Sequence, residues 1–120
     1  MEVLHGEVPI EQIAYFVSQA GFSRFPVDDE GKIIGYIHVN QIMQALNSDD
    51  REDIVAKFAS PIKSISENMT VDMVFRGMQK DRTHMYLVHD EIDEEDIVGL
   101  VTMENVLEEI VGEIKDETDD

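Results

Sequence analysis

The chain has no cysteine, which excludes disulfide bonds and thiolate metal sites. Basic residues are scarce, because nine Lys and Arg stand against 27 Asp and Glu, and the formal net charge is −18. This surplus argues against nucleic acids and anionic lipids as general partners, since both are bound through a basic surface. An anionic ligand would need a local basic spot or an accompanying cation.

Long apolar runs are also missing. No stretch reaches the ~18 residues of a membrane span, and the first residues lack the basic start and apolar core of a signal peptide. Hydrophobic residues still make up 42% of the 120 residues, which predicts one compact domain with a substantial core. The absence of cysteine favours a reducing compartment.

An internal repeat is the most informative feature that the chain does have. Residues 33–42 return as residues 97–106, with apolar on apolar, glycine on glycine and polar on polar, and residues 25–27 return as residues 86–88. A repeat of this length indicates two copies of one supersecondary unit, neither of which is expected to bury its apolar face alone. We therefore look for function between the copies.

The first copy is predicted to run strand, helix, strand, strand, helix. Its strands are placed at residues 3–4, 24–27 and 33–38, and its second helix at residues 39–46. Its first helix is predicted to have Pro9 in the first turn and Gly21 at its end. The apolar stripe of that helix comprises Ile13, Phe16, Val17 and Ala20.

The second copy repeats this order after a polar connection. A small amphipathic helix is predicted at residues 51–58, before Pro61. Thr70 then caps a helix whose apolar stripe comprises Val71, Val74, Phe75 and Met78. Strands are predicted at residues 62–65, 84–89 and 97–102, and a last helix at residues 103–114 with Leu107, Ile110, Val111 and Ile114 on one face.

These elements define a mixed α+β fold in which helices cover sheets. We expect a first motif at residues 1–46, a linker with a short helix at 47–60, a second motif at 61–114 and an acidic tail at 115–120. The acidic segment 90–96 is expected to be a solvated hairpin, because it lacks the spacing of a calcium-binding loop.

In the residues of these predicted strands and helices, the sequence resembles a tandem pair of cystathionine-β-synthase (CBS) domains. Residues 22–27 and 33–39 are similar to the first half of such a pair. Residues 99–114, GLVTMENVLEEIVGEI, resemble a string specific to the CorC/HlyC-like group. These are bacterial membrane proteins linked to magnesium and cobalt efflux, some of them described as haemolysin-like. The resemblance covers nearly the whole chain.

The resemblance implies a regulatory module rather than an enzyme. Its two motifs would pack through their sheets with pseudo-twofold symmetry, and AMP or ATP would bind in the clefts between them. It further implies a homodimer, a parent protein with a transmembrane domain and a C-terminal domain, and a place on the cytoplasmic side of the inner membrane. ATP is expected to arrive with Mg²⁺, because the acidic surface repels the free triphosphate.

The family motif assigns nucleotide-binding roles to the start of the last helix. Thr102 matches a threonine that contacts phosphate or ribose, and Asn105 replaces an aspartate that binds the ribose hydroxyls, without its charge. Helix amides with a hydroxyl can form an anion site, although a simple N-cap explains Thr102 equally well. In the first copy His38 and Gln41 stand at these positions, which predicts an empty or weaker second cleft.

The remaining predicted contacts follow from the same resemblance. His84 would lie where phosphates emerge, near the bases Arg76, Lys80 and Arg82, although bases at a helix C-terminus also fit its dipole. The adenine end would be lined by Val3, Leu4, Phe22, Ser23 and Arg24.

No catalytic triad, phosphate-binding glycine loop or metal-binding histidine spacing occurs, so we expect no enzymatic activity. The alternative function is a ligand-free dimerisation scaffold, which the departures at Asn105 and Gln41 favour.

Overall fold

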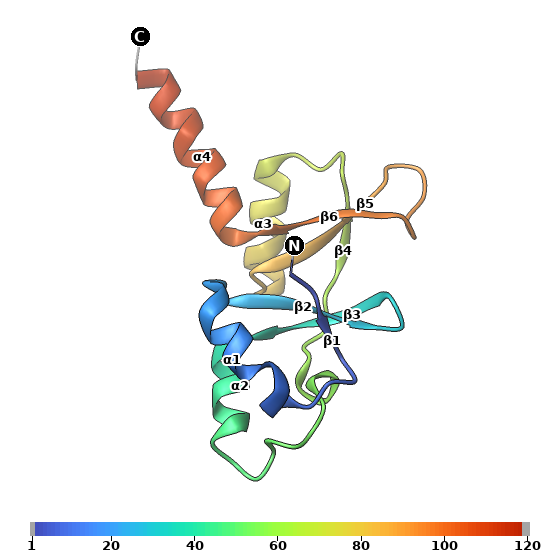
Figure 1. Ribbon diagram of the computed structural model, residues 1–120. Coiled ribbons are helices and arrows are strands. Elements are labelled where there is room, and N and C mark those ends of the chain that lie inside the picture. The colour runs from blue at the N-terminus through green and yellow to red at the C-terminus, as the bar shows by residue number, and fades with distance from the viewer. Residues whose placement is uncertain (1, 119–120) are drawn as a thin grey trace. The chain divides into compact units, whose positions relative to one another are not determined.

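The structure is a computed structural model that describes residues 2–118 (Figure 1). The chain divides into two compact units, Met1–Pro61 and Ile62–Asp120. The first unit contains β1 (Leu4–His5), α1 (Ile10–Ala20), β2 (Arg24–Asp29), β3 (Lys32–His38), α2 (Val39–Leu46) and the 3-10 helix η1 (Val55–Phe58). The second contains β4 (Ser64–Ser66), α3 (Val71–Asp81), β5 (Met85–His89), β6 (Ile97–Thr102) and α4 (Met103–Thr118). The predicted α+β fold with two strand-helix-strand-strand-helix repeats is confirmed.

Both units build the same three-stranded sheet. The strand orders are β1-β2-β3 and β4-β5-β6, and in each sheet the first pair is parallel and the second antiparallel. The registers also agree, because Val27 pairs with Gly35 as Val88 pairs with Gly99. A parallel pair needs a crossover, which α1 and α3 supply. Positions related by the sequence repeat are therefore equivalent in structure, and the two units can be compared residue by residue.

The first unit has a core between its helices and its sheet. Ile10, Ala14 and Val17 are the buried residues of α1, and they pack in one cluster with Phe25 and Ile37. The predicted α1 stripe was therefore partly wrong, since Phe16 is 47% exposed. Pro9 is the N-cap in extended conformation rather than part of the first turn, and the helix begins at Ile10, which is fully buried.

The predicted helix at residues 51–58 is also wrong, because only Val55–Phe58 is helical, as a 3-10 turn. The segment before it is used to satisfy the start of α1: the amide of Ile10 donates to the carbonyl of Asp53 over 2.9 Å, and that of Glu11 to the carbonyl of Arg51 over 3.0 Å. A carbonyl that accepts a hydrogen bond from the first amides of another helix cannot also accept the bond that a local helix would need. The side chain of Val55 is fully buried in the first unit's core.

Several local predictions are confirmed. Gly21 ends α1 in the left-handed conformation at φ 79°, and Thr70 caps α3 by accepting a hydrogen bond from the amide of Met73. Val74 and Met78 are buried on the predicted face of α3. The helix at residues 39–46 has the predicted bounds.

The last helix differs from its prediction in length and in burial. It continues to Thr118, so residues 115–118 of the predicted acidic tail are helical, whereas residues 119–120 lie outside the described residues. Val106 is buried in the second core and Ile110 packs against it. Leu107, Val111 and Ile114 are exposed. Within residues 2–118, no helix is long and apolar enough to cross a membrane.

Candidate functional site

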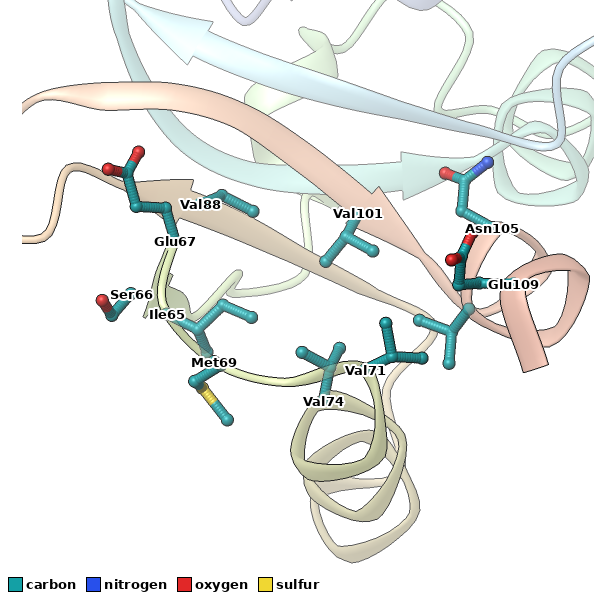
Figure 2. A pocket seen from close by; sticks show the side chains of 11 residues that line it. Ile65, Ser66, Glu67, Met69, Val71, Val74, Val88, Val101, Asn105 and Glu109 are labelled. Atoms are coloured by element: carbon teal, nitrogen blue, oxygen red, sulfur yellow. The ribbon is translucent and has the colours of Figure 1, made fainter. Parts of the chain in front are cut away.

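The second unit contains an open pocket of about 290 Å³ (Figure 2). Its apolar walls come from β4, the start of α3, the middle of the β5–β6 hairpin and the first turns of α4. The lining residues are Ile65, Ser66, Glu67, Met69, Val71, Val74, Val88, Val101, Asn105, Val106 and Glu109.

The pocket has an apolar floor and an acidic rim. In Figure 2 the side chains of Val71, Val74 and Val101 point toward one another, while Glu67 and Glu109 lie on opposite sides. Both carboxylates are exposed. The floor can accept an apolar group, and the rim repels an anion such as a phosphate. The sequence does not predict this pocket, because its walls are apolar positions that have the pattern of an ordinary core.

Thr102 and Asn105 form reciprocal hydrogen bonds at the start of α4. The amide of Asn105 donates to Thr102 Oγ1 over 3.2 Å, and the Thr102 hydroxyl donates to Asn105 Oδ1 over 2.9 Å. The Thr102 amide also points to Asn105 Oδ1, at 3.4 Å. The N-cap predicted as the alternative for Thr102 is thus present, in the reciprocal form of a capping box.

His38 and Gln41 do the same at the start of α2. The His38 ring accepts from the amide of Asn40 at Nδ1 over 3.0 Å, and Gln41 Oε1 accepts from the His38 amide over 2.9 Å. The two family-motif positions are therefore capping positions in both units, and their side-chain oxygens and ring nitrogen are already engaged.

In each unit, the loop that precedes the central strand (β2 or β5) is hydrogen-bonded to the first residue of the last helix (α2 or α4). The carbonyl of Ser23 accepts from the amide of Val39 over 2.8 Å, and that of His84 accepts from the amide of Met103 over 2.9 Å. In the second unit this brings the predicted residues His84, Thr102 and Asn105 together. In the first it brings Ser23 beside His38.

The other predicted residues of the first unit differ in exposure. Leu4 is 4% exposed and belongs to the hydrophobic core, whereas Val3 is half-buried. Phe22 is 57% exposed, and its ring meets that of Phe25 edge-on with centroids 6.1 Å apart. Arg24 is half-buried at the start of β2. Their roles toward a ligand stay predictions.

The predicted basic cluster is partly neutralised. Arg76 forms an ion pair with Asp72 over 2.9 Å, one turn earlier on α3. Lys80 lies in the last turn of α3 and Arg82 caps it in the left-handed conformation, so the helix-dipole interpretation describes both positions. His84 is exposed beside them.

A buried phenol fixes the end of this helix, which the sequence did not indicate. The Tyr86 hydroxyl donates to Asp81 Oδ2 over 2.5 Å, and Lys63 lies 3.4 Å from the same oxygen. Burial and this hydrogen bond raise the pKa of Tyr86 to about 12. The hydrogen bond from Tyr86 in turn lowers the pKa of the Asp81 carboxyl, with Lys63 adding to the effect.

The acidic hairpin between β5 and β6 is held by hydrogen bonds to its side chains, and Asn68 Nδ2 donates to Glu91 Oε2 over 2.6 Å. Asp90 Oδ2 accepts from the amides of Ile92 and Asp93 over 2.9 and 3.0 Å, and these bonds lower the pKa of Asp90. Across the described range 2–118, no group of three or more His, Asp or Glu side chains could hold a metal ion.

Comparison with known proteins assigns the fold to a class. A family model described as the CBS domain matches residues 1–48 and 52–112. The chain therefore belongs to the CBS-domain family, as a tandem pair.

The relatives narrow this assignment to one group. "UPF0053 protein YhdP" of Bacillus subtilis is 32% identical over 94% of this chain and 26% of its own length. "Magnesium and cobalt efflux protein CorC" of Pasteurella multocida is 31% identical over 98% of this chain and 39% of its own length. A solved CBS domain of a bacterial CNNM/CorC family Mg²⁺ transporter in complex with ATP shares 29% identity, with a TM-score of 0.83, over 93% of this chain and 80% of that one. The predicted resemblance to the CorC/HlyC-like group is confirmed, and the chain spans only a quarter to two fifths of the length of these two curated relatives.

Proposed function

We propose that this chain is an adenine-nucleotide-binding regulatory module of a CorC/HlyC-like membrane protein linked to magnesium or cobalt transport. The observation that carries the proposal is its similarity in sequence and structure to a CBS domain solved with ATP. The clustering of His84, Thr102 and Asn105 at the start of α4 supports it, because amides and a hydroxyl at a helix start favour a phosphate or ribose.

Asn105 would act as a donor in this role. Its Oδ1 already accepts from Thr102, so the group left for a ribose hydroxyl is the Nδ2 amide. An aspartate would accept from the ribose instead, with a charge-assisted bond. We therefore expect weaker ribose binding here than with an aspartate. The bases Lys80 and Arg82 would provide the positive potential for phosphates, and Mg²⁺ would accompany ATP.

The first unit would bind nucleotide weakly or not at all through His38 and Gln41. Both side chains serve the capping box of α2, and neither carries a negative charge for a ribose. Val3, Leu4, Phe22, Ser23 and Arg24 remain the candidates for the adenine end. The Leu4 side chain would have to contribute from within the core, so we rank it below Phe22 and Ser23.

In the parent protein this module would have no enzymatic role of its own. We propose that it works as a homodimer on the cytoplasmic side of the membrane, next to transmembrane and C-terminal domains. We keep residues 1–46 and 61–114 as the two motifs and residues 47–60 as the linker. Nucleotide binding would then shift the module between conformations by its differential affinity for them.

The test is calorimetric titration with AMP, ADP, ATP and MgATP. Saturable heat with at least one of them at up to millimolar concentration is expected. A module that gives no heat with any of the four is a ligand-free scaffold, the second candidate. One observation favours that scaffold: the motif side chains of both units already satisfy one another's hydrogen bonds.

A further inference from the structure

One carboxylate joins three parts of the second unit. Asp81 is the last residue of α3, and its Oδ2 accepts a hydrogen bond from the Tyr86 hydroxyl of β5 over 2.5 Å. Lys63, in the segment before β4, places its Nζ 3.4 Å from the same oxygen. We call Lys63, Asp81 and Tyr86 the anchor. Because the three residues come from separate segments, the anchor fixes the end of α3 against the sheet.

The packing around Tyr86 keeps a place open for its hydroxyl. Tyr86 is 1% exposed and belongs to the core of the second unit. A Cβ added at Gly77 of α3 would lie 2.9 Å from the hydroxyl oxygen, which is closer than such atoms pack. Glycine is a poor helix former, so the room it leaves for the phenol gives a physical reason for its presence inside α3. The hydrogen bond from Tyr86 to Asp81 therefore depends on the core packing of this unit.

The anchor directly precedes a turn with an uncommon backbone conformation. Arg82 ends α3 in the left-handed region at φ 53°, and its amide and that of Thr83 both donate to the carbonyl of Met78. Glycine is the usual residue at such a helix end, and the first unit has Gly21 there at φ 79°. A residue with a Cβ holds this conformation less easily than glycine does. The turn of the second unit therefore gains from a contact that fixes the residue before it, and Asp81 makes that contact.

The turn at residues 82–84 leads to the start of α4. The carbonyl of His84 accepts from the amide of Met103 over 2.9 Å, and Met85 pairs with Thr102 in the register of β5 and β6. A shift of the turn would therefore move His84 and loosen the first amide of α4. The anchor thus connects to the candidate site through a short path of covalent and hydrogen bonds.

The first unit has the same turn but different residues at the anchor positions. The repeat places Glu2, Ala20 and Phe25 at the positions of Lys63, Asp81 and Tyr86. The side chains of alanine and phenylalanine have no group that donates or accepts a hydrogen bond. The carbonyl of Ser23 nevertheless accepts from the amide of Val39 over 2.8 Å. The hydrogen bond from turn to helix start is common to both units, whereas the anchor belongs to the unit that carries Thr102 and Asn105.

We propose that Asp81 and Tyr86 are positioning residues for the nucleotide site at the start of α4. They hold the turn at residues 82–84, and through it they keep His84 and the first amide of α4 in place for a ribose and a phosphate. A site that is ordered before the ligand arrives binds more tightly than one that the ligand must order. Neither residue touches the nucleotide. The inference rests on the proposed nucleotide binding, and it adds a reason why the second unit binds more tightly than the first.

Calorimetric titration with AMP and MgATP tests the effect on binding. Tyr86→Phe keeps the buried ring and removes the hydroxyl, and it should weaken binding about fivefold or more. Asp81→Asn is the conservative variant, because its amide oxygen can still accept from Tyr86, and it should stay within about twofold of the wild type. Asp81→Ala removes the acceptor and should bind as weakly as Tyr86→Phe. Tyr15→Phe is the matched control, since Tyr15 is 78% exposed, and should leave the affinity unchanged.

Hydrogen exchange of the Met103 amide gives a readout that needs no nucleotide. In the ligand-free chain, NMR should find this amide exchanging about fivefold faster or more in Tyr86→Phe than in the wild type, because the carbonyl of His84 is held less firmly. Amides of the β5–β6 ladder should keep their rates, and so should Val39, the equivalent of Met103 in the first unit. Asp81→Asn should protect Met103 as the wild type does. A general loss of stability would speed all of these amides together.

Three results would overturn the inference. They are unchanged nucleotide affinity in Tyr86→Phe, a loss of affinity in Asp81→Asn equal to that in Asp81→Ala, and exchange of Met103 that rises only together with the β5–β6 ladder. Absence of nucleotide binding by the wild type is a different failure. It contradicts the proposed function, and the exchange of Met103 then decides alone whether the anchor positions the start of α4.

Discussion

The amide of Asn105 donates to Thr102 Oγ1, and the hydroxyl of Thr102 donates back to Asn105 Oδ1 over 2.9 Å. One pair of side chains therefore caps α4 and also occupies the positions that the family motif assigns to the nucleotide. His38 and Gln41 form the equivalent pair in the first unit. This duplication lets the capping role and the binding role be separated by experiment.

Asn105→Ala should weaken nucleotide binding at least fivefold, which is ~1 kcal/mol. The reason is that it removes the amide proposed to meet the ribose hydroxyls. Calorimetric titration measures the change. Gln41→Ala is the matched control, because it breaks the same capping box in the unit expected to bind weakly. Equal losses in both variants would remove Asn105 from the binding site.

Thr102→Ala should lower the free energy of unfolding by ~1 kcal/mol, the usual cost of a lost N-cap. Thr102→Ser keeps the hydroxyl and should remain close to wild type. Urea unfolding followed by circular dichroism measures both variants. An unchanged urea midpoint in Thr102→Ala would show that the cap contributes nothing to the fold.

Val55→Ala should destabilise the chain by roughly 2 kcal/mol, because it opens a cavity under the linker in the first core. Its neighbour Ile54, which is 44% exposed, offers a control. Ile54→Ala should cost about 0.5 kcal/mol or less, as is usual at the surface. Similar costs for the two in a urea titration would contradict the linker's role as a core element.

Tyr86 should make the stability sensitive to alkaline pH. Its folded pKa, about 12, lies above the ordinary 10.0. The stability it contributes is therefore fully present below about pH 10 and is lost as the pH rises through the folded value. Tyr86→Phe should show a smaller drop in urea midpoint between pH 8 and about pH 11 than the wild type does.

Tyr15→Phe is the control for that measurement, since Tyr15 is 78% exposed. It should keep the wild-type alkaline drop. If Tyr86→Phe showed the same alkaline drop in urea midpoint as Tyr15→Phe and the wild type, the prediction would be wrong. The pKa of Tyr86 would then not differ between the folded and unfolded chain.

Elements set by local chemistry could be predicted from the sequence. Gly21 ends a helix and Thr70 begins one because each satisfies backbone needs within its own turn. The repeat predicted the order of elements in both units, since equivalent residues face equivalent surroundings. The resemblance to the CBS family carried the candidate residues at the start of α4.

Features set by distant parts of the chain could not be predicted. Residues 51–58 have the pattern of an amphipathic helix, but the carbonyls of Arg51 and Asp53 accept from the first amides of α1, far away in sequence. Phe16 fits the predicted apolar stripe of α1. The buried face of the helix is instead the one that carries Ile10, Ala14 and Val17, so Phe16 lies outside it. The pocket of the second unit could not be predicted, because its lining residues come from five elements and no local pattern shows which of them meet.

The most direct measurement is a crystal structure of the chain grown with AMP or MgATP. We expect a nucleotide at the start of α4, with its ribose beside Asn105 and a phosphate near Thr102 and His84. A nucleotide bound elsewhere, or none bound at saturating concentration while the pair Thr102–Asn105 stays closed, would contradict this expectation.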